Sequence, residues 1–301
     1  MFDFIGDVHG YGLKLEALLK KLGYQKVNGV YKHSERKAFF LGDYIDRGPE
    51  IPLTLQIVRS MVESGNALAL MGNHEYNALA FENTFEGKPL RPHTPANIRQ
   101  YRETQDQFDY IRATYESHLK WFFDLPLFHQ TEDFCAVHAC WDVDQVSALE
   151  KNINGVKLDY TSLVESSNIG SELHKQIEVT LKGKEVDLPE GVFFRDKDKN
   201  KRTRIRIKWW KDPSNKTYQE IALPYLESIP NVPVPAFSEF DSIYGKEEKP
   251  VFFGHYWLKG QPVIQRENIC CLDFSVAKEG YLAAYRFDGE QVLDSANIIY
   301  V

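Results

Sequence analysis

Short apolar runs alternate with helical patterns in the first third of the chain. The apolar runs Phe2 to Ile5, Ala38 to Leu41 and Ala67 to Met71 have the length of buried strands. Apolar residues then recur at helical spacing in two segments, at Leu15, Leu18, Leu19 and Leu22 and at Leu55, Val58 and Val62. Strands that alternate with helices predict a layered α/β architecture with mostly parallel central strands.

The later pattern is less regular. Residues 85–107 carry several prolines among polar residues and predict a surface insertion, with helical spacing returning only near Phe108. Residues 142–249 are polar and charged, with prolines from Pro224 to Pro235, and predict a second insertion of substrate-facing loops. We expect residues 1–301 to form a single domain with these two insertions.

The C-terminal segment predicts antiparallel strands. Short apolar runs from Ile269 onward are separated by Gly280 and by Asp288-Gly289. The Asp288-Gly289 pair between two apolar runs is typical of a tight hairpin turn.

Polar motifs follow the three early strands. They read Gly6-Asp7-Val8-His9-Gly10, Gly42-Asp43-Tyr44-Ile45-Asp46-Arg47-Gly48 and Gly72-Asn73-His74-Glu75. Two later apolar runs each end in a histidine, His138 and His255. Because ligands in open α/β sheets gather beyond the carboxyl ends of the strands, we expect these side chains to converge.

The residue types in these motifs suit metal binding. Asp7 and His9 are two residues apart, so in an extended segment both side chains point the same way and can share one cation. A carboxylate with an imidazole suits first-row transition metals better than magnesium or calcium. Asp43 has two carboxylate oxygens and can bridge to a second ion, whose shell Asn73, His138 and His255 would complete.

Such a pair of ions, about 3.5–4 Å apart, can hold a hydroxide and aim it in line at phosphorus. Simpler readings exist for each motif, since Asp-x-His occurs in ordinary loops and Gly-Asn-His-Glu is typical of a helix N-terminus. They do not explain why all five segments end an apolar strand with metal-binding side chains.

The ordered set resembles the calcineurin-like metallophosphoesterases, specifically the phosphoprotein phosphatase branch. That branch carries Gly-Asp-x-His-Gly, Gly-Asp-x-x-Asp-Arg-Gly and Gly-Asn-His-Glu before two later histidines, and the resemblance extends from Asp7 to at least His255. It implies a four-layer α/β fold, in which two mixed β-sheets pack face to face and helices cover the outside. His138-Ala139-Cys140 replaces the His-Gly-Gly of eukaryotic-type members and is similar to bacterial diadenosine tetraphosphatases.

The resemblance also implies residue roles. Asp7, His9 and Asp43 would bind one metal, and Asp43, Asn73, His138 and His255 the other. His74 would be the general acid, with Asp46 orienting its ring and favouring its protonated form. Arg47 would bind the phosphoryl oxygens, because guanidinium geometry suits bidentate contact. The cofactors are two divalent ions, for which we expect manganese, with iron and zinc as alternatives.

Residues 202–213 offer a second phosphate contact. Arg204, Arg206 and Lys208 alternate with Ile205, Ile207 and Trp209, so a strand here would have one basic and one apolar face. We select Arg206 as the residue that contacts phosphate. A solvated charged face and a nucleic-acid contact are the alternatives.

Composition and charge limit the partners and the compartment that we expect for this chain. The formal net charge of −7 argues against a general nucleic-acid binder, although a basic run from Arg195 to Lys211 holds nine Lys or Arg in 17 positions. An apolar run that starts at Phe2 leaves no room for a signal peptide, and no segment is long and apolar enough for a membrane span. We expect a cytoplasmic protein without membrane association, whose four cysteines are reduced core thiols.

These observations predict a dinuclear-metal phosphoesterase that hydrolyses phosphate monoesters, on a phosphoprotein or a small molecule, by in-line attack of a metal-bridging hydroxide. The alternatives are hydrolysis of a dinucleoside polyphosphate, with aromatic residues of the Tyr101 to Tyr115 segment or Trp209 and Trp210 stacking on bases, and phosphate removal from nucleic-acid ends. A noncatalytic scaffold is disfavoured, because every motif residue is present.

Overall fold

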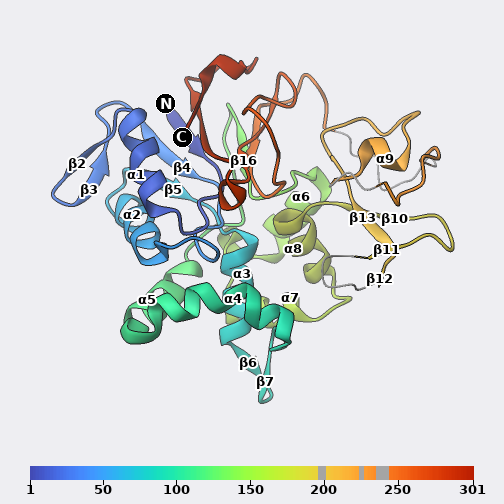
Figure 1. Cartoon of the computed structure of the whole chain (residues 1–301), viewed down its shortest axis with the longest axis horizontal. Helices are drawn as coiled ribbons and strands as arrows, with labels where there is room; N and C mark the ends of the chain where they lie inside the picture. The colour runs from blue at the N-terminus through green and yellow to red at the C-terminus, as the bar shows by residue number, and fades with distance from the viewer. Residues whose placement is uncertain (196–200, 224–226, 235–243) are drawn as a thin grey trace.

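Two mixed β-sheets form the centre of the molecule (Figure 1), in a computed structural model that describes residues 1–195, 201–223, 227–234 and 244–301. The larger sheet has the order β16 (Asp273–Phe274), β17 (Tyr281–Phe287), β1 (Phe2–Ile5), β4 (Lys37–Phe40) and β5 (Ala67–Ala69), with β18 (Ile298–Tyr300) also paired to β17. The smaller sheet has the order β15 (Ile269–Cys271), β14 (Val251–Phe253), β9 (Cys135–Val137) and β8 (Phe128–Gln130). β1, β4 and β5 are parallel, as are β9, β14 and β15.

The sheets pack face to face through an aromatic layer. Phe4 of β1 stacks on Phe252 of β14 with ring centroids 3.8 Å apart, and Phe39, Phe134 and Tyr285 belong to the same buried cluster. Because successive side chains of a strand point to opposite faces, the neighbours of these residues face the outer helices. The motif-bearing strands are therefore buried on both faces, which explains their largely apolar sequences. The exception in β1 is Asp3, which pairs with Arg36 at 2.9 Å.

Helices cover the outer faces, as the four-layer prediction requires. α1 (Gly12–Lys21) and α2 (Ile51–Glu63) pack on the outside of the larger sheet at the left of Figure 1. Each of the three early strands is followed by a helix, the third being α3 (Asn73–Glu82). The strand, motif and helix order predicted for the first third is confirmed.

Residues 85–107 contain more helix than predicted. A short hairpin of β6 (Thr84–Phe85) and β7 (Lys88–Pro89) leads into α4 (Pro95–Phe108), followed by η1 (Asp109–Ile111) and α5 (Arg112–Phe122). The expectation that helical spacing returns only near Phe108 was wrong. α4 buries a single narrow stripe of Tyr101, Thr104 and Phe108. Pro95 is the first helical residue, directly after the Thr94 cap, so this proline starts a helix.

Residues 142–249 are likewise not only loops. α6 (Val143–Asn152), η2 (Asn154–Val156), α7 (Tyr160–Ser167) and α8 (Glu172–Lys182) precede a small unit with its own core, at the right of Figure 1. In it β10 (Glu185–Asp187) pairs with β13 (Arg204–Arg206) beside α9 (Tyr218–Ile221). Ile205 and Ile207 are buried there, which confirms the predicted alternation. β11 (Phe194–Arg195) pairs with β12 (Lys201–Arg202), while Pro224 and Pro235 lie outside the described residues.

The C-terminal strands differ in part from the prediction. β15 is parallel to β14, and the chain then crosses into the larger sheet, where β16, β17 and β18 are antiparallel. β17 and β18 are separated by residues 288–297, including η5 (Ser295–Asn297), so the expected tight hairpin at Asp288-Gly289 was wrong. The remaining small elements are the hairpin of β2 (Gln25–Val27) with β3 (Val30–Lys32), and η4 (Val276–Lys278).

Two further findings concern the environment of the chain. The four cysteines are all buried and unpaired. Among the described residues, no helix has both the length and the apolar character that crossing a bilayer requires.

Candidate metal centre

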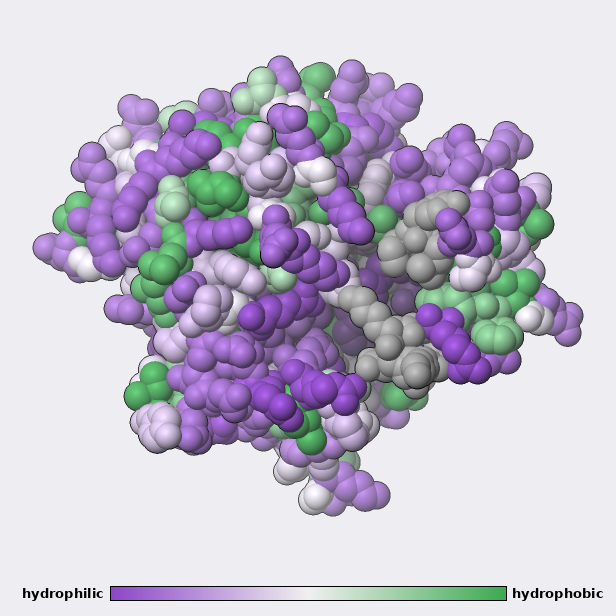
Figure 2. Space-filling model, viewed as in Figure 1, coloured by the Kyte–Doolittle hydropathy of each residue, from purple (hydrophilic) through white to green (hydrophobic). Residues whose placement is uncertain are grey.

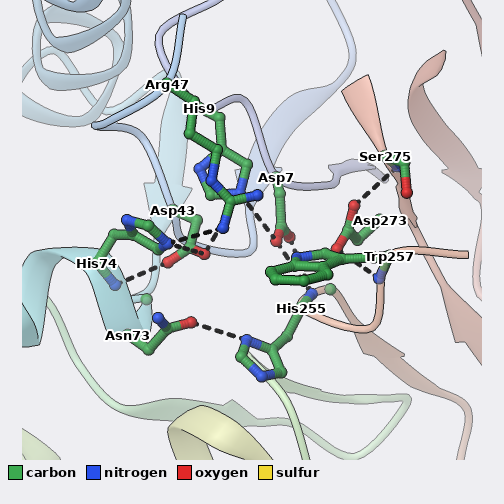
Figure 3. A network of polar contacts seen from close by, with 12 residues as sticks. Asp7, His9, Asp43, Arg47, Asn73, His74, His255, Trp257, Asp273 and Ser275 are labelled. Carbon is green, nitrogen blue, oxygen red and sulfur yellow. Dashed lines mark hydrogen bonds and ion pairs between the residues drawn. The ribbon is translucent and has the colours of Figure 1, made fainter. Parts of the chain in front are cut away.

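The loops that follow β1, β4, β5 and β14 meet in a polar cluster (Figure 3), and His138 from the loop after β9 lies beside Asp43 in it. Several residues of these loops have left-handed backbone conformations, with φ of 47° at His9, 55° at Asp43, 67° at Asp46, 71° at Arg47 and 71° at His255. Non-glycine residues rarely adopt positive φ, and such strain persists where surrounding structure fixes it. The turns after these strands are therefore held by the surrounding structure in strained left-handed conformations, and these conformations bring the side chains together.

Asp7, His9 and Asp43 are the first group of predicted ligands, and the structure places them close together. His9 Nε2 lies 3.6 Å from Asp43 Oδ2 and 3.9 Å from Asp7 Oδ2. The other ring nitrogen, Nδ1, is 3.2 Å from the Ile45 carbonyl oxygen and donates to it. All three side chains are at most 2% exposed. This carbonyl contact leaves Nε2 as the ring nitrogen that faces the carboxylates and that could bind a metal.

Asp43, Asn73, His138 and His255 form the second group. Asn73 Oδ1 lies 3.1 Å from His138 Nε2 and 2.7 Å from His255 Nδ1. Asp43 Oδ1 is 3.4 Å from His138 Nε2, which makes Asp43 common to both groups. His138 Nδ1 donates to the Leu41 carbonyl at 2.8 Å and thereby fixes the ring.

The donor set fits divalent cations. His9 Nε2 is buried and has no hydrogen-bond partner among the residues described here, as expected of an atom whose lone pair is meant for a metal. Burial and then the charges of Asp273 and Asp43 raise the pKa of Asp7 well above its usual range. Burial, and then the charge of Arg206, lowers the pKa of His255. At His138 burial acts in the same direction, but the charge of Asp43 outweighs it and raises the pKa. An imidazole kept neutral next to crowded carboxylates, as at His255, is a favourable ligand for a cation.

His74 lies beside the ligand groups, within a hydrogen-bonded chain. Its Nδ1 is 2.5 Å from Asp46 Oδ2, and the Thr104 hydroxyl donates to Asp46 Oδ1 at 2.5 Å. The His74 amide donates to Asp43 Oδ1 at 2.9 Å, which ties the helix start to the metal-facing carboxylate. His74 Nε2 is 3.3 Å from Arg47 Nη2, so the imidazole and the guanidinium face the same space.

Arg206 reaches the site from the small β10–β13 unit. Its Nη1 is 2.8 Å from His255 Nε2. The other cations of the same strand pattern have different contacts, since Arg204 pairs with Asp187 at 3.3 Å and Lys208 donates to the Glu220 carbonyl. The choice of Arg206 among the alternating cations therefore agrees with its position, and its contact with phosphate stays a prediction.

Sequence reasoning gave Glu75 no role at the site. Its buried carboxylate accepts from the backbone amides of Asp43 at 2.9 Å, Tyr44 at 2.8 Å and Gly72 at 3.0 Å. Burial, and then the charge of Asp43, raises the pKa of Glu75 to about 7. Glu75 thus connects the loop after β4 with the loop after β5. This role follows from the backbone amides that surround the start of α3 in space, and the sequence does not show them.

Thr104 and Asp273 were also missed. Thr104 comes from α4, where one small polar residue in a helix gives no signal. Asp273 is 1% exposed and accepts from the amides of Trp257 at 2.8 Å and Ser275 at 2.9 Å. It fixes Trp257, whose ring centroid lies 4.7 Å from the Arg47 guanidinium carbon. An acidic residue inside an apolar strand was the available signal for Asp273.

Most of the aromatic residues considered for base stacking are in the core, although Tyr110 of the Tyr101 to Tyr115 segment is 96% exposed. Tyr101, Tyr115, Trp209 and Trp210 are all at most 6% exposed. Trp209 Nε1 donates to the Ala139 carbonyl at 3.0 Å and packs against Phe253. These four side chains are therefore packing residues.

The sandwich of two sheets, with a cluster of metal-binding side chains at its strand ends, defines a metallophosphoesterase. The sequence model of the family described as calcineurin-like phosphoesterase matches residues 1–255, and the chain belongs to this family. Members generally use a dinuclear metal centre. Among the described residues, this chain brings together two groups of side chains that could hold a metal ion, His9 with Asp43 and His74, and Asp43 with His138 and His255.

Individual relatives give a finer comparison. The chain is 27% identical over 300 residues to a symmetrical bis(5'-nucleosyl)-tetraphosphatase of Marinomonas sp., covering 95% of this chain and 94% of that one. It is 48% identical over 73 residues to the asymmetrical bis(5'-nucleosyl)-tetraphosphatase PrpE of Oceanobacillus iheyensis, a match that spans 24% of this chain and 29% of the relative. A protein serine/threonine phosphatase from Saccharomyces cerevisiae, with similarity to human phosphatase PP5, has the same fold with a TM-score of 0.53 and 14% identity, over all of this chain and 78% of that one.

Proposed function

We propose that this chain hydrolyses phosphate monoesters with two divalent cations bound between the loops that follow β1, β4, β5, β9 and β14. The observation that carries the proposal is the convergence of Asp7, His9, Asp43, Asn73, His138 and His255, in which His9 Nε2 is buried without a hydrogen-bond partner among the described residues. When bound, the ions would supply an activated water molecule and positive charge for the phosphoryl oxygens. Manganese is our proposed ion at both positions, with iron or zinc as the alternatives.

Side chains of the protein would donate the proton to the leaving oxygen and bind the phosphoryl group. His74 is proposed to hold a proton on Nε2 and give it to the leaving oxygen, while Asp46 accepts from Nδ1 and orients the ring. Arg47, 3.3 Å from His74, would bind two phosphoryl oxygens and so direct the leaving group toward the acid. Arg206 would bind the phosphoryl group from the opposite side, beside His255.

A second candidate reaction is cleavage of a dinucleoside polyphosphate. It is favoured by the Marinomonas relative, whose name states that activity and whose match covers 95% of this chain. The same ligands and the same acid would serve, because both reactions displace an oxygen from phosphorus in line with the attacking water.

Phosphate and nucleotide release from a substrate panel tests the proposal. Protein dialysed against a chelator is refilled with Mn²⁺, Zn²⁺ or Fe²⁺ and given p-nitrophenyl phosphate, phosphopeptides and diadenosine tetraphosphate. Metal-dependent turnover of the monoesters would support the monoester reaction, and turnover of the dinucleotide alone would move the assignment to the second candidate. No metal-dependent turnover of any substrate would contradict both.

A further inference from the structure

A two-stranded ribbon brings Arg206 to the metal centre. β10 and β13 pair antiparallel, with Glu185 opposite Arg206 and Asp187 opposite Arg204 (Figure 1). Both acidic residues form ion pairs across the ribbon, Glu185 Oε1 with Arg206 Nη2 at 3.8 Å and Asp187 Oδ1 with Arg204 Nε at 3.3 Å. Unlike charges directly opposite each other stabilise such a pairing of strands. Of the two ion pairs, the one formed by Glu185 and Arg206 lies next to His255.

The guanidinium of Arg206 contacts His255 at one terminal nitrogen and Glu185 at the other. Nη1 is 2.8 Å from His255 Nε2, and Nη2 is the atom that faces Glu185. Arg206 Nε is buried and has no hydrogen-bond partner among the described residues. Because each terminal nitrogen carries two N–H groups, these contacts leave donors for a phosphoryl group.

The stem of Arg206 is fixed by close packing at Gly183. A Cβ atom built on Gly183 would lie 2.2 Å from Tyr256 Oη and 3.4 Å from Arg206 Cδ, and Gly183 has a φ of 89°. Only glycine allows the backbone to approach the tyrosine this closely in this conformation. Tyr256 is 4% exposed, and its ring meets that of His255 edge-on with centroids 5.7 Å apart. The Arg206 stem is therefore confined, whereas its terminal nitrogens can exchange one partner for another by rotation.

The ion pair between Glu185 and Arg206 is accessible to water. The Glu185 side chain is 42% exposed and the Arg206 side chain 29%. Partly exposed ion pairs are weak, so a phosphate can displace the carboxylate. Figure 2 shows mainly hydrophilic residues over α4, the helix that carries Thr104 beside the centre, so the surface on this side suits the passage of an anion.

A carboxylate at the position of Glu185 opposes a bound phosphate in two ways. It occupies N–H donors of Arg206, and its charge repels a phosphate dianion that binds the same guanidinium. Glu185 and phosphate therefore compete for Arg206, and removal of the carboxylate should strengthen phosphate binding.

We propose that Glu185 is a positioning residue that competes with the phosphoryl group for Arg206, and that this competition limits how tightly the product orthophosphate is retained. The inference rests on the proposed function in one respect, the binding of a phosphoryl group by Arg206. It adds a residue that acts on product release through Arg206.

Two variants of one strand test the proposal. Glu185→Gln and Asp187→Asn each remove one negative charge of β10 that faces an arginine of β13, with little change in shape. Orthophosphate binding to Mn²⁺-loaded protein is measured by calorimetry for the wild type and both variants. We expect Glu185→Gln to bind orthophosphate roughly 2- to 5-fold more tightly, an increase that should shrink at high salt. Asp187→Asn should bind it as the wild type does, because Asp187 pairs with Arg204.

Arg206→Gln shows whether the effect passes through the arginine. Alone, it should weaken orthophosphate binding about 10-fold, since charge-assisted contacts are lost. Combined with Arg206→Gln, the Glu185→Gln change should no longer strengthen binding. Circular dichroism shows whether each variant is folded. Unchanged binding in Arg206→Gln would remove the contact on which the proposal rests and would overturn it.

Three other results would also overturn the proposal. Equal tightening in Glu185→Gln and Asp187→Asn would reduce the effect to general charge. Unchanged binding in Glu185→Gln would mean that the carboxylate and phosphate do not compete. Weaker binding in Glu185→Gln would mean that Glu185 instead aims Arg206 at the phosphate.

Turnover of p-nitrophenyl phosphate separates competition from loss of structure. In Glu185→Gln, the KM and the inhibition constant of orthophosphate should both fall by the factor found by calorimetry. A structural defect would instead lower kcat without strengthening product inhibition. Absence of turnover on every substrate, with the tighter binding in Glu185→Gln retained, would reject the proposed function and keep the competition for Arg206 at an anion site beside His255.

Discussion

His74 is surrounded by metal-facing groups without belonging to either set of proposed ligands. Its Nδ1 is occupied by Asp46 at 2.5 Å, while its Nε2 faces Arg47. We predict that His74→Asn keeps its metal and loses activity by roughly 10²–10⁴-fold, because it removes the proton donor alone. Asp43→Asn should lose both metal and activity, since Asp43 is shared by the two groups. Metal content by mass spectrometry and phosphate release give the two readouts.

Equal loss of metal in the His74 and Asp43 variants would contradict the acid role of His74. A control, Asp124→Asn, changes an exposed aspartate and should alter neither readout.

Thr104 acts on the site through Asp46 only. Its hydroxyl donates to Asp46 Oδ1 at 2.5 Å and accepts from the Asp46 amide at 3.0 Å. Thr104→Val has nearly the same shape and removes both contacts, so we predict a kcat about 10-fold lower with unchanged metal content. Because Asp46 would orient His74, the pH–rate profile should also shift, which a merely structural residue would not cause. Rescue by Thr104→Ser is the control, and a profile that keeps its shape in Thr104→Val would refute the role.

The residues of the site were predictable to different degrees. Asp7, His9, Asp43, His138 and His255 stand directly after apolar strands, so position alone indicates that they share an edge. Thr104 and Asp273 approach the site from segments far away in the sequence, and Glu75 acts through backbone amides that carry no side-chain signature. The contacts of these three residues depend on how helices and loops pack against one another. The pattern of apolar and polar residues along the sequence does not predict that packing.

Among the secondary-structure elements, the buried strands were the easiest to predict from the sequence. β14, and β4 from Ala38 onward, are continuous apolar runs because both of their faces are covered. β1 departs from this pattern at the buried Asp3. α4 was missed because Tyr101, Thr104 and Phe108 are its only buried residues, and a narrow stripe among charged residues resembles a loop. The path from β15 to β16, which changes sheets between Cys271 and Asp273, likewise follows from packing rather than from any turn residue.

The helix α5 should confer acid sensitivity through His118. This side chain is 7% exposed, and burial, with a smaller contribution from Arg59 opposed by Glu63, lowers its pKa to about 4. In the unfolded chain its pKa is about 6.5. The unfolded chain therefore takes up the proton first, and stability that is present above pH 6.5 is lost as the pH falls toward 4.

We predict that wild-type protein loses roughly 1–2 kcal/mol more unfolding free energy than His118→Gln between pH 8 and pH 5. Urea unfolding of metal-free protein at both values measures the difference. His33→Gln, which changes a partly exposed histidine, should follow the wild type. Parallel losses in His118→Gln and the wild type would mean that His118 stays unprotonated in the unfolded chain or is not buried in solution.

For the molecule as a whole, the metal centre is the point where the two sheets are joined at their strand ends. Asp7 and His9 follow β1 and Asp43 follows β4 in the larger sheet, whereas His138 and His255 follow β9 and β14 in the smaller one. A cation shared by these loops would bind only the folded chain, because the ligands are dispersed over about 250 residues of sequence. Bound metal should therefore stabilise the sandwich as well as serve the reaction.

We predict that Mn²⁺ at about 100 times its dissociation constant adds about 2.7 kcal/mol to the free energy of unfolding of chelated protein. For a chain of 301 residues this corresponds to a rise in Tm of roughly 4 °C. Scanning calorimetry of the chelated protein, with and without added metal, measures the rise. Asp43→Asn removes the proposed ligand common to both groups and should abolish it, whereas Asp124→Asn, which changes an exposed aspartate, should retain it. A rise of equal size in Asp43→Asn would place the stabilising metal elsewhere.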